Sequence, residues 1–95
     1  MANALMSLQI IPKANGESVI PYIDEAIHMI SLTGLKYNVQ PLETTVEGEL
    51  DFLLAMLVKI NERMTEMGCE NVISQVKLFY QPSGITMQQL TEKYH

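Results

Sequence analysis

The sequence of 95 residues contains no tryptophan, only one cysteine and only six lysine and arginine residues. Because a disulfide within the chain needs two cysteines, Cys69 cannot form one, and its solitary thiol favours a reducing compartment. We therefore expect a cytoplasmic protein. The basic residues are scattered, and the formal net charge is -5. An acidic chain without a basic stripe repels phosphate groups, so we expect neither nucleic acid nor a membrane surface as a partner.

Long hydrophobic runs and biased segments are also missing. The apolar runs are a few residues long, whereas a membrane-spanning helix needs about 20 consecutive apolar residues. The first residues lack the basic start and the longer apolar centre of a secretory signal. A chain of this length that is 47% hydrophobic suits one domain with one core. We expect a single domain over residues 1–95, with residues 83–95 as a terminal extension.

Hydrophobic periodicity predicts the regular elements. Alternation with a period of two predicts four β-strands, at residues 4–12, 35–40, 44–46 and 71–80. Helical spacing predicts one helix over residues 19–33 before Gly34 and a longer one over residues 50–67 before Gly68. Glycine favours the left-handed backbone that ends a helix. A short third helix is predicted within residues 86–94.

The order strand, helix, strand, strand, helix, strand predicts a ferredoxin-like fold, given the handedness of crossover connections. We expect an α+β sandwich (βαββαβ) in which an antiparallel four-stranded sheet carries two helices on one face. The helix-covered face should carry Met6, Leu8, Ile10, Tyr37, Val39, Val76 and Leu78. The open face should carry Ser7, Gln9, Ile11, Asn38, Gln40, Ile73, Gln75, Lys77 and Phe79. Because this second face mixes polar and apolar groups, it predicts a ligand, a partner subunit or both.

Residues for catalysis or metal binding are scarce. His28 lies within the first predicted helix, His95 is the final residue, and no nucleophile has a base at a recognisable spacing. Cys69 follows a helix end, where a small packing residue is the usual role. Two distant histidines and one cysteine are not a metal-ligand set, and the carboxylates lack the spacing of a calcium loop. We therefore expect no enzyme, no metal site and no cofactor.

The segment 43–51 is rich in carboxylates and lies where a strand becomes a helix. Two interpretations fit it. In the first, Thr44 and Glu47 form a capping box, and acidic residues near a helix start are favoured by the helix dipole. In the second, Glu47 is an acceptor for a cationic or amine-bearing ligand, and Gly48 lets the backbone approach that ligand because it has no Cβ atom.

Four segments of the sequence resemble the small thiamine-binding protein family. They are LQIIP at 8–12, YIDEAI at 22–27, TGLKY at 33–37 and TTVEGELD at 44–51. The most specific part is Thr-x-x-Glu-Gly-Glu after a Gly-Leu-x-Tyr strand start, and the resemblance covers about residues 4 to 80. Glu43 departs from the family pattern, which commonly has a small residue there. The charged stretch that usually follows the fourth strand is also replaced, here by KLFYQP.

The resemblance implies a ferredoxin-like subunit that assembles into homodimers or homotetramers. It also implies that the protein binds thiamine, or its hydroxymethylpyrimidine part, without transforming it, so that thiamine is a ligand and not a cofactor. The motif implies binding roles for Thr44, Glu47 and Gly48. Further candidates come from the open sheet face and not from the resemblance, namely Ser7, Gln9, Asn38 and, as a ring for stacking, Phe79.

A second hypothesis is a structural or regulatory assembly module that has no small-molecule ligand and uses the open sheet face for subunit contacts. Replacing Glu47 separates the two hypotheses. Loss of a ligand contact would abolish binding, whereas loss of a helix cap would cost only about 1 kcal/mol of stability. A third hypothesis, an enzyme acting on a thiamine precursor, ranks last because the sequence offers no acid–base pair for it.

Overall fold

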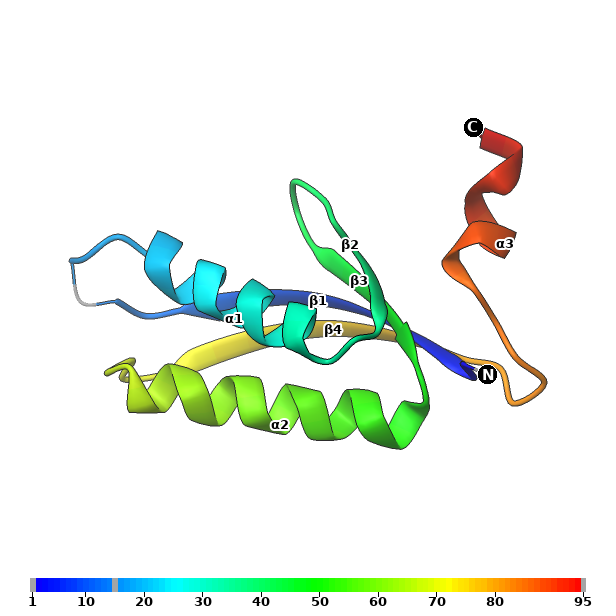
Figure 1. Ribbon diagram of the computed structural model, residues 1–95. Coiled ribbons are helices and arrows are strands. Elements are labelled where there is room, and N and C mark those ends of the chain that lie inside the picture. The colour runs from blue at the N-terminus through cyan, green and yellow to red at the C-terminus, as the bar shows by residue number, and fades with distance from the viewer. Residues whose placement is uncertain (1, 15, 95) are drawn as a thin grey trace.

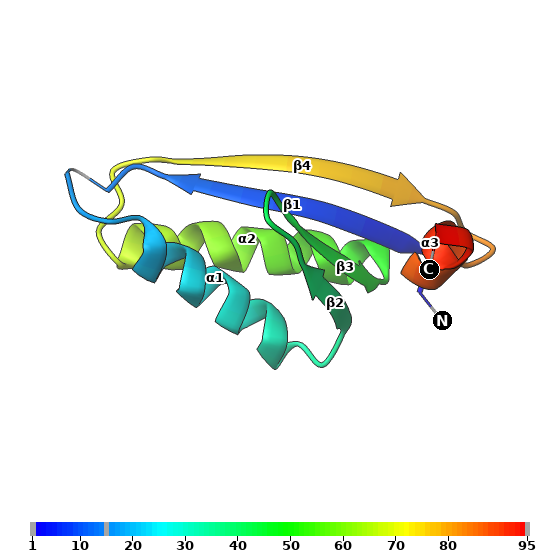
Figure 2. The same ribbon diagram turned by 90° about the horizontal axis from the view of Figure 1, so that it is seen from above.

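The computed structural model describes residues 2–14 and 16–94. The elements along the chain are β1 (Ala4–Pro12), α1 (Ile20–Leu32), β2 (Lys36–Val39), β3 (Thr44–Gly48), α2 (Leu50–Glu66), β4 (Val72–Tyr80), α3 (Met87–Thr91) and a 3-10 turn (Glu92–Tyr94). The strands form one antiparallel sheet in the order β2-β3-β1-β4. Figure 1 and Figure 2 show α1 and α2 together on one side of this sheet. The predicted ferredoxin-like α+β sandwich is confirmed, and in the described ranges no helix is long and apolar enough to cross a membrane.

The alternation along β1 explains why both helices cover the same face. Met6, Leu8 and Ile10 are at most 8% exposed, whereas the intervening Ser7 and Gln9 are half-buried and exposed. The buried side chains on the helix face of β1 pack in one cluster with Val46, Ile30, Leu53, Ile60 and Met64. Burying one such side chain stabilises the fold by roughly 1.5–3 kcal/mol relative to leaving it exposed. This cluster therefore fixes the side of the sheet on which the helices lie.

Two residues predicted for the covered face, Val39 and Leu78, are 53% and 42% exposed. The register places both on the helix side, because Val39 lies opposite Thr44 and Leu78 lies opposite Met6. However, Val39 is on β2 and Leu78 is on β4, and these strands are the two edges of the sheet. The prediction of their face is confirmed and the prediction of their burial is wrong, because an edge strand has a neighbour on one flank only.

The transition from β3 to α2 excludes the capping-box interpretation. β3 continues to Gly48, beyond its predicted end, and the N-cap of α2 is Glu49, which makes no side-chain cap hydrogen bond. The amide of Leu50 instead donates to Oδ1 of Asn3 at 2.9 Å. The capping box predicted for Thr44 and Glu47 is therefore wrong, because both residues belong to the strand.

Gly48 has a packing role at the end of β3. A Cβ atom at this position would lie 2.9 Å from Cδ1 of Leu35 and 3.4 Å from Cδ2 of Leu53. The first distance is shorter than real Cβ contacts allow, so a larger residue would force the Leu35 side chain to move. The missing side chain of Gly48 thus lets the loop before β2 and the start of α2 approach the sheet.

Residues 81–94 return over one end of the open sheet face. The amide of Gln81 donates to the carbonyl of Asn3 at 2.8 Å. Ile85 and Met87 then pack against Leu5 in a second buried cluster, on the side of the sheet opposite the main core. The short third helix predicted from the sequence is confirmed as α3.

Candidate functional site

A groove of about 210 Å³ lies between α1 and the turn that joins β2 to β3. It forms because β1 pairs with β3 only from Ala4 to Leu8, whereas it pairs with β4 as far as Pro12. Beyond Leu8 the β2–β3 hairpin leaves the sheet and rises beside α1, as Figure 1 shows. The groove is lined by Leu8, Gln9 and Ile10 of β1, by Ile23, Ala26, Ile27 and Ile30 of α1, and by residues 39–44.

Polar contacts fix α1, which forms one wall of the groove. Nε of Arg63 on α2 donates to Oε2 of Glu25 on α1 at 2.7 Å, and this bond raises the pKa of Arg63. The hydroxyl of Tyr22 donates to Oε2 of Glu17 at 3.2 Å. Burial, followed by this hydrogen bond, raises the pKa of Tyr22. Arg63 and Tyr22 thus keep their usual protonation states at neutral pH. The bond from Arg63 joins the middle of α1 to α2, and the bond from Tyr22 joins the first turn of α1 to the loop before it.

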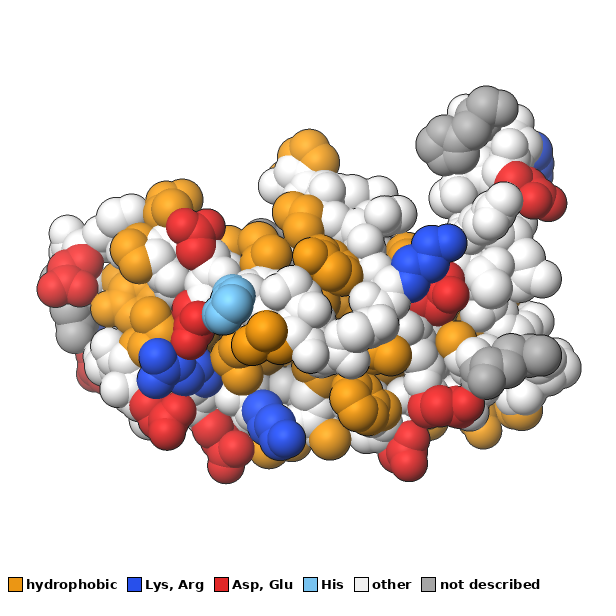
Figure 3. All heavy atoms as spheres, in the orientation of Figure 1, with side chains coloured by type: hydrophobic (Ala, Val, Ile, Leu, Met, Phe, Trp, Pro, Cys, Tyr) orange, Lys and Arg blue, Asp and Glu red, His pale blue; other side chains and the backbone are white. Residues whose placement is uncertain are grey.

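The lining of the groove combines apolar walls with one carboxylate. The side chains from α1 are apolar, and Figure 3 shows hydrophobic side chains reaching the surface over α1 and over the hairpin. Among the lining residues that the structure describes, Glu43 carries the only formal charge. The hydroxyl of Ser7 donates to Oε2 of Glu43 at 2.6 Å and so orients this carboxylate. An apolar cleft with few polar groups suits a small ring ligand, and the carboxylate favours a cation or an amine.

The free edge of β1 adds backbone groups to this site. Gln9 and Ile10 line the groove at positions where β1 has no β3 partner. Peptide groups at a strand edge offer a donor beside an acceptor at fixed spacing. A ring that carries an amino group next to a ring nitrogen presents the complementary pair.

The seven residues predicted for the site do not form one cluster. Five of them share the sheet face opposite the helices, namely Ser7, Gln9, Asn38, Glu47 and Phe79. Glu47 and Phe79 both lie opposite Leu5, whereas Ser7 and Asn38 both lie opposite Thr45. The side chain of Thr44 points toward the helices, and Gly48 occupies the same face of β3. Thr44 and Glu47 of the sequence motif therefore point to opposite sides of the sheet. Of the seven, Gln9 and Thr44 line the groove.

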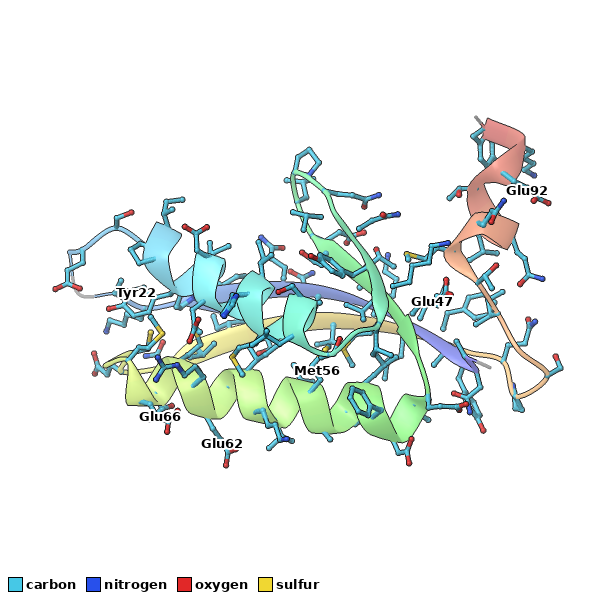
Figure 4. All side chains as sticks on the ribbon, viewed as in Figure 1. Tyr22, Glu47, Met56, Glu62, Glu66 and Glu92 are labelled. Carbon is cyan, nitrogen blue, oxygen red and sulfur yellow. The ribbon has the colours of Figure 1, made fainter. Side chains whose placement is uncertain are left out.

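The carboxylate of Glu47 holds the C-terminal segment. Its Oε1 accepts a hydrogen bond from the backbone amide of Met87 at 2.8 Å, across forty residues of sequence. Nδ2 of Asn38 lies 3.8 Å from the sulfur of the same methionine. Figure 4 shows Glu47 on β3 beside the segment that leads into α3. The ligand contacts predicted for Glu47, Asn38 and Gly48 stay predictions.

Sequence reasoning missed most of the groove. Ile23 and Ile27 are half-buried and widen the apolar stripe of α1 beyond the three residues that the helix buries. The sequence signal that could have revealed the groove was therefore an apolar stripe on α1 that is wider than packing against the core requires. Glu43 was visible as one of the carboxylates of segment 43–51 and as a departure from the family pattern, but nothing in the sequence placed it in a groove with α1.

Comparison with known proteins gives concordant results. The family model described as thiamine-binding protein matches residues 6–95. A protein of an uncharacterised family from Clostridium perfringens (strain 13 / Type A) is 40% identical over 89 residues, which are 94% of each chain. A solved domain of unknown function from Bacillus cereus has a TM-score of 0.92 at 35% identity, covering 99% of this chain and 91% of that one. A solved protein of Thermotoga maritima, described as a candidate for thiamine biosynthesis or salvage, has a TM-score of 0.89 at 28% identity, covering 98% and 99%.

Proposed function

This chain belongs to the thiamine-binding protein family, and from that premise we propose that it binds thiamine or a related hydroxymethylpyrimidine compound without transforming it. The Thermotoga maritima relative, described as a candidate for thiamine biosynthesis or salvage, supports the same class of ligand. A cytoplasmic location and assembly into a homodimer or homotetramer are parts of the same proposal, and they rest on the sequence.

The groove beside α1 is the observation that carries the proposal. Thiamine joins an aminopyrimidine ring to a thiazolium ring that carries a positive charge. Apolar side chains such as Ile23 and Ile27 can cover the faces of such rings, and the oriented carboxylate of Glu43 can meet the amino group or the cation. The edge of β1 at Ile10 offers the donor and acceptor that an aminopyrimidine needs, because neighbouring odd-numbered positions direct their peptide groups toward β4.

The size of the groove favours one ring inside it. Sites for drug-sized ligands typically enclose roughly 300–1,000 Å³, and this groove measures about 210 Å³. We therefore place the pyrimidine ring between α1 and the hairpin, with the thiazolium ring toward the opening near Glu43. In this arrangement the pyrimidine supplies most of the buried contact, and the cation supplies the charge contact.

The lining supports binding without chemistry. General acid–base catalysis needs a proton donor and a proton acceptor placed at the reacting atoms. Among the lining residues that the structure describes, Glu43 is the only acidic or basic side chain. A single carboxylate can bind a cation, but it gives no acid–base pair.

The test is calorimetric titration of the purified protein with thiamine, hydroxymethylpyrimidine and thiamine phosphate. Saturable binding of thiamine is expected. Glu43→Gln should weaken thiamine binding about fivefold, since an exposed charge pair contributes up to roughly 1 kcal/mol. The same substitution should change the affinity for the neutral hydroxymethylpyrimidine by less than about twofold, because that ligand lacks the cation.

Glu47→Gln is the matched control, because it removes one carboxylate near the other end of β3, where Glu47 holds the C-terminal segment and does not line the groove. If Glu47→Gln abolishes binding while Glu43→Gln does not, the ligand lies on the open sheet face beneath the C-terminal segment and the groove is wrong. If none of the three compounds binds at a concentration where a micromolar site would add about 2.7 kcal/mol at a hundredfold excess over Kd, the ligand proposal fails. The assembly module is then the remaining hypothesis.

A further inference from the structure

The tip of the β2–β3 hairpin leaves a large apolar side chain in water at the mouth of the groove. Leu42 is 78% exposed, and Val39 on the same hairpin is 53% exposed. Both residues line the groove. Leu8 of β1 and Ile30 of α1 line it as well, and they are at most 3% exposed. The groove thus has a buried floor and an apolar rim that water covers.

The pairing of the strands supports the base of this hairpin and not its tip. β3 pairs with β1 only as far as Thr44, which lies opposite Leu8. The amide of Gln40 donates to the carbonyl of Glu43 at 2.9 Å and closes the turn upon itself. The side chain of Glu43 is tied to the sheet by the hydroxyl of Ser7. The turn at residues 40–43, which stands clear of the sheet in Figure 1, can therefore tilt without breaking the pairing of β1 with β3.

A ring bound in this groove needs a cover on the side of the hairpin. Ile23 and Ile27 are half-buried and line the wall that α1 forms. Leu42 is on the opposite wall, so a tilt of the turn toward α1 would bring its side chain onto the ring. Transfer of an apolar side chain from water onto an apolar surface is favourable. A tilt with no ring between the walls would leave a void and forfeit those contacts.

We propose that the turn at residues 40–43 closes toward α1 over a bound ring and that Leu42 is a ligand contact in the closed position. This inference rests on the proposed function, because it needs a ligand in the groove. The ligand shifts the turn toward closure because it contacts Leu42 in that position alone. The turn must reopen before the ligand leaves, so Leu42 acts chiefly on the rate of dissociation.

Binding kinetics on the immobilised protein test the role of Leu42. Leu42→Ala removes most of the covering side chain and should raise the dissociation rate of thiamine about tenfold. The association rate should change less than about twofold, because the ligand enters while the turn is open. Hydroxymethylpyrimidine should show the same increase in dissociation rate, since the pyrimidine ring is the part that Leu42 covers. Glu43→Gln, in contrast, should affect thiamine alone.

Leu32→Ala is the matched control. Leu32 is 72% exposed, is the last residue of α1 and does not line the groove. It therefore matches Leu42 in size and exposure but has no role in closure. The dissociation rates in Leu32→Ala should equal those of the wild-type protein. Both variants should unfold at the same urea concentration as the wild-type protein, because exposed side chains contribute little to folding.

Thiol reactivity measures the closure itself. In Leu42→Cys, saturating thiamine should slow the reaction of the new thiol with a water-soluble reagent at least fivefold, because closure places it against the ring. In Leu32→Cys the rate should not change. The wild-type protein controls for Cys69, which is buried.

The outcomes separate this proposal from the ligand proposal. If the wild-type protein binds thiamine and Leu42→Ala dissociates at the same rate, closure is wrong and the ligand proposal stands. Equal effects of Leu42→Ala and Leu32→Ala, or an unchanged thiol reaction at position 42, would also overturn closure. If the wild-type protein binds none of the three compounds, the ligand proposal fails, and closure over the ligand fails with it.

Discussion

Replacing Glu47 with alanine should loosen the C-terminal segment while the main core stays folded. The carboxylate accepts the amide of Met87 at 2.8 Å, and a hydrogen bond to a charged group contributes roughly 1.5–3 kcal/mol. Glu47 is half-buried, so solvent weakens this bond, and we take about 1–2 kcal/mol. A loss of this size raises the population of the opened segment about 5- to 30-fold. The cluster of Leu5, Ile85 and Met87 still holds the segment most of the time.

Native-state hydrogen exchange measures this opening. The amide of Ile85 bonds to the carbonyl of Ala2 at 3.1 Å and keeps this partner in the variant, so its exchange reports opening of the segment. Its exchange should accelerate about 5- to 30-fold in Glu47→Ala, whereas the amide of Leu53 in α2 should not change. Glu47→Gln, which retains an oxygen acceptor, should give a smaller acceleration. Unchanged exchange at Ile85, or equal acceleration at Leu53, would refute the reasoning.

Two further predictions concern the helix layer. Leu53→Ala removes a side chain that is 0% exposed in the main core, so it should lower the free energy of unfolding by about 2–5 kcal/mol in urea denaturation. A loss below about 1 kcal/mol would mean that the cluster is loosely packed. Arg63→Gln breaks the contact with Glu25 between α2 and α1, where the two side chains are 43% and 24% exposed, and should cost less than about 1 kcal/mol in the same assay. A larger loss would show that this ion pair is more than a surface contact.

The sequence motif around β3 shows how far local reasoning reaches. Thr44 and Glu47 match the family motif, and sequence reasoning placed them in one site. In a strand, however, residues three positions apart project from opposite faces, because the side-chain period is two. The structure extends β3 through both residues. The odd spacing was visible in the sequence, but its consequence depended on knowing that the strand continues to Gly48.

Residues on the edge strands of the sheet show a second limit of predicting burial from the sequence. Leu78 alternates with the same phase as Val76, and nothing in its local pattern separates an edge strand from a central one. Its 42% exposure follows from the strand order, which places β4 outside β1.

The sequence by itself determined the elements, their order and the phase of each apolar face. These follow from backbone periods and from the handedness of crossovers, both of which act over short stretches of chain. Only the tertiary structure decided where the groove lies and what Glu47 holds. The groove depends on the residue at which β3 stops pairing with β1, and the contact of Glu47 joins it to Met87, forty residues away. Such features arise from register and packing between distant segments, and no local pattern of residues encodes either of them.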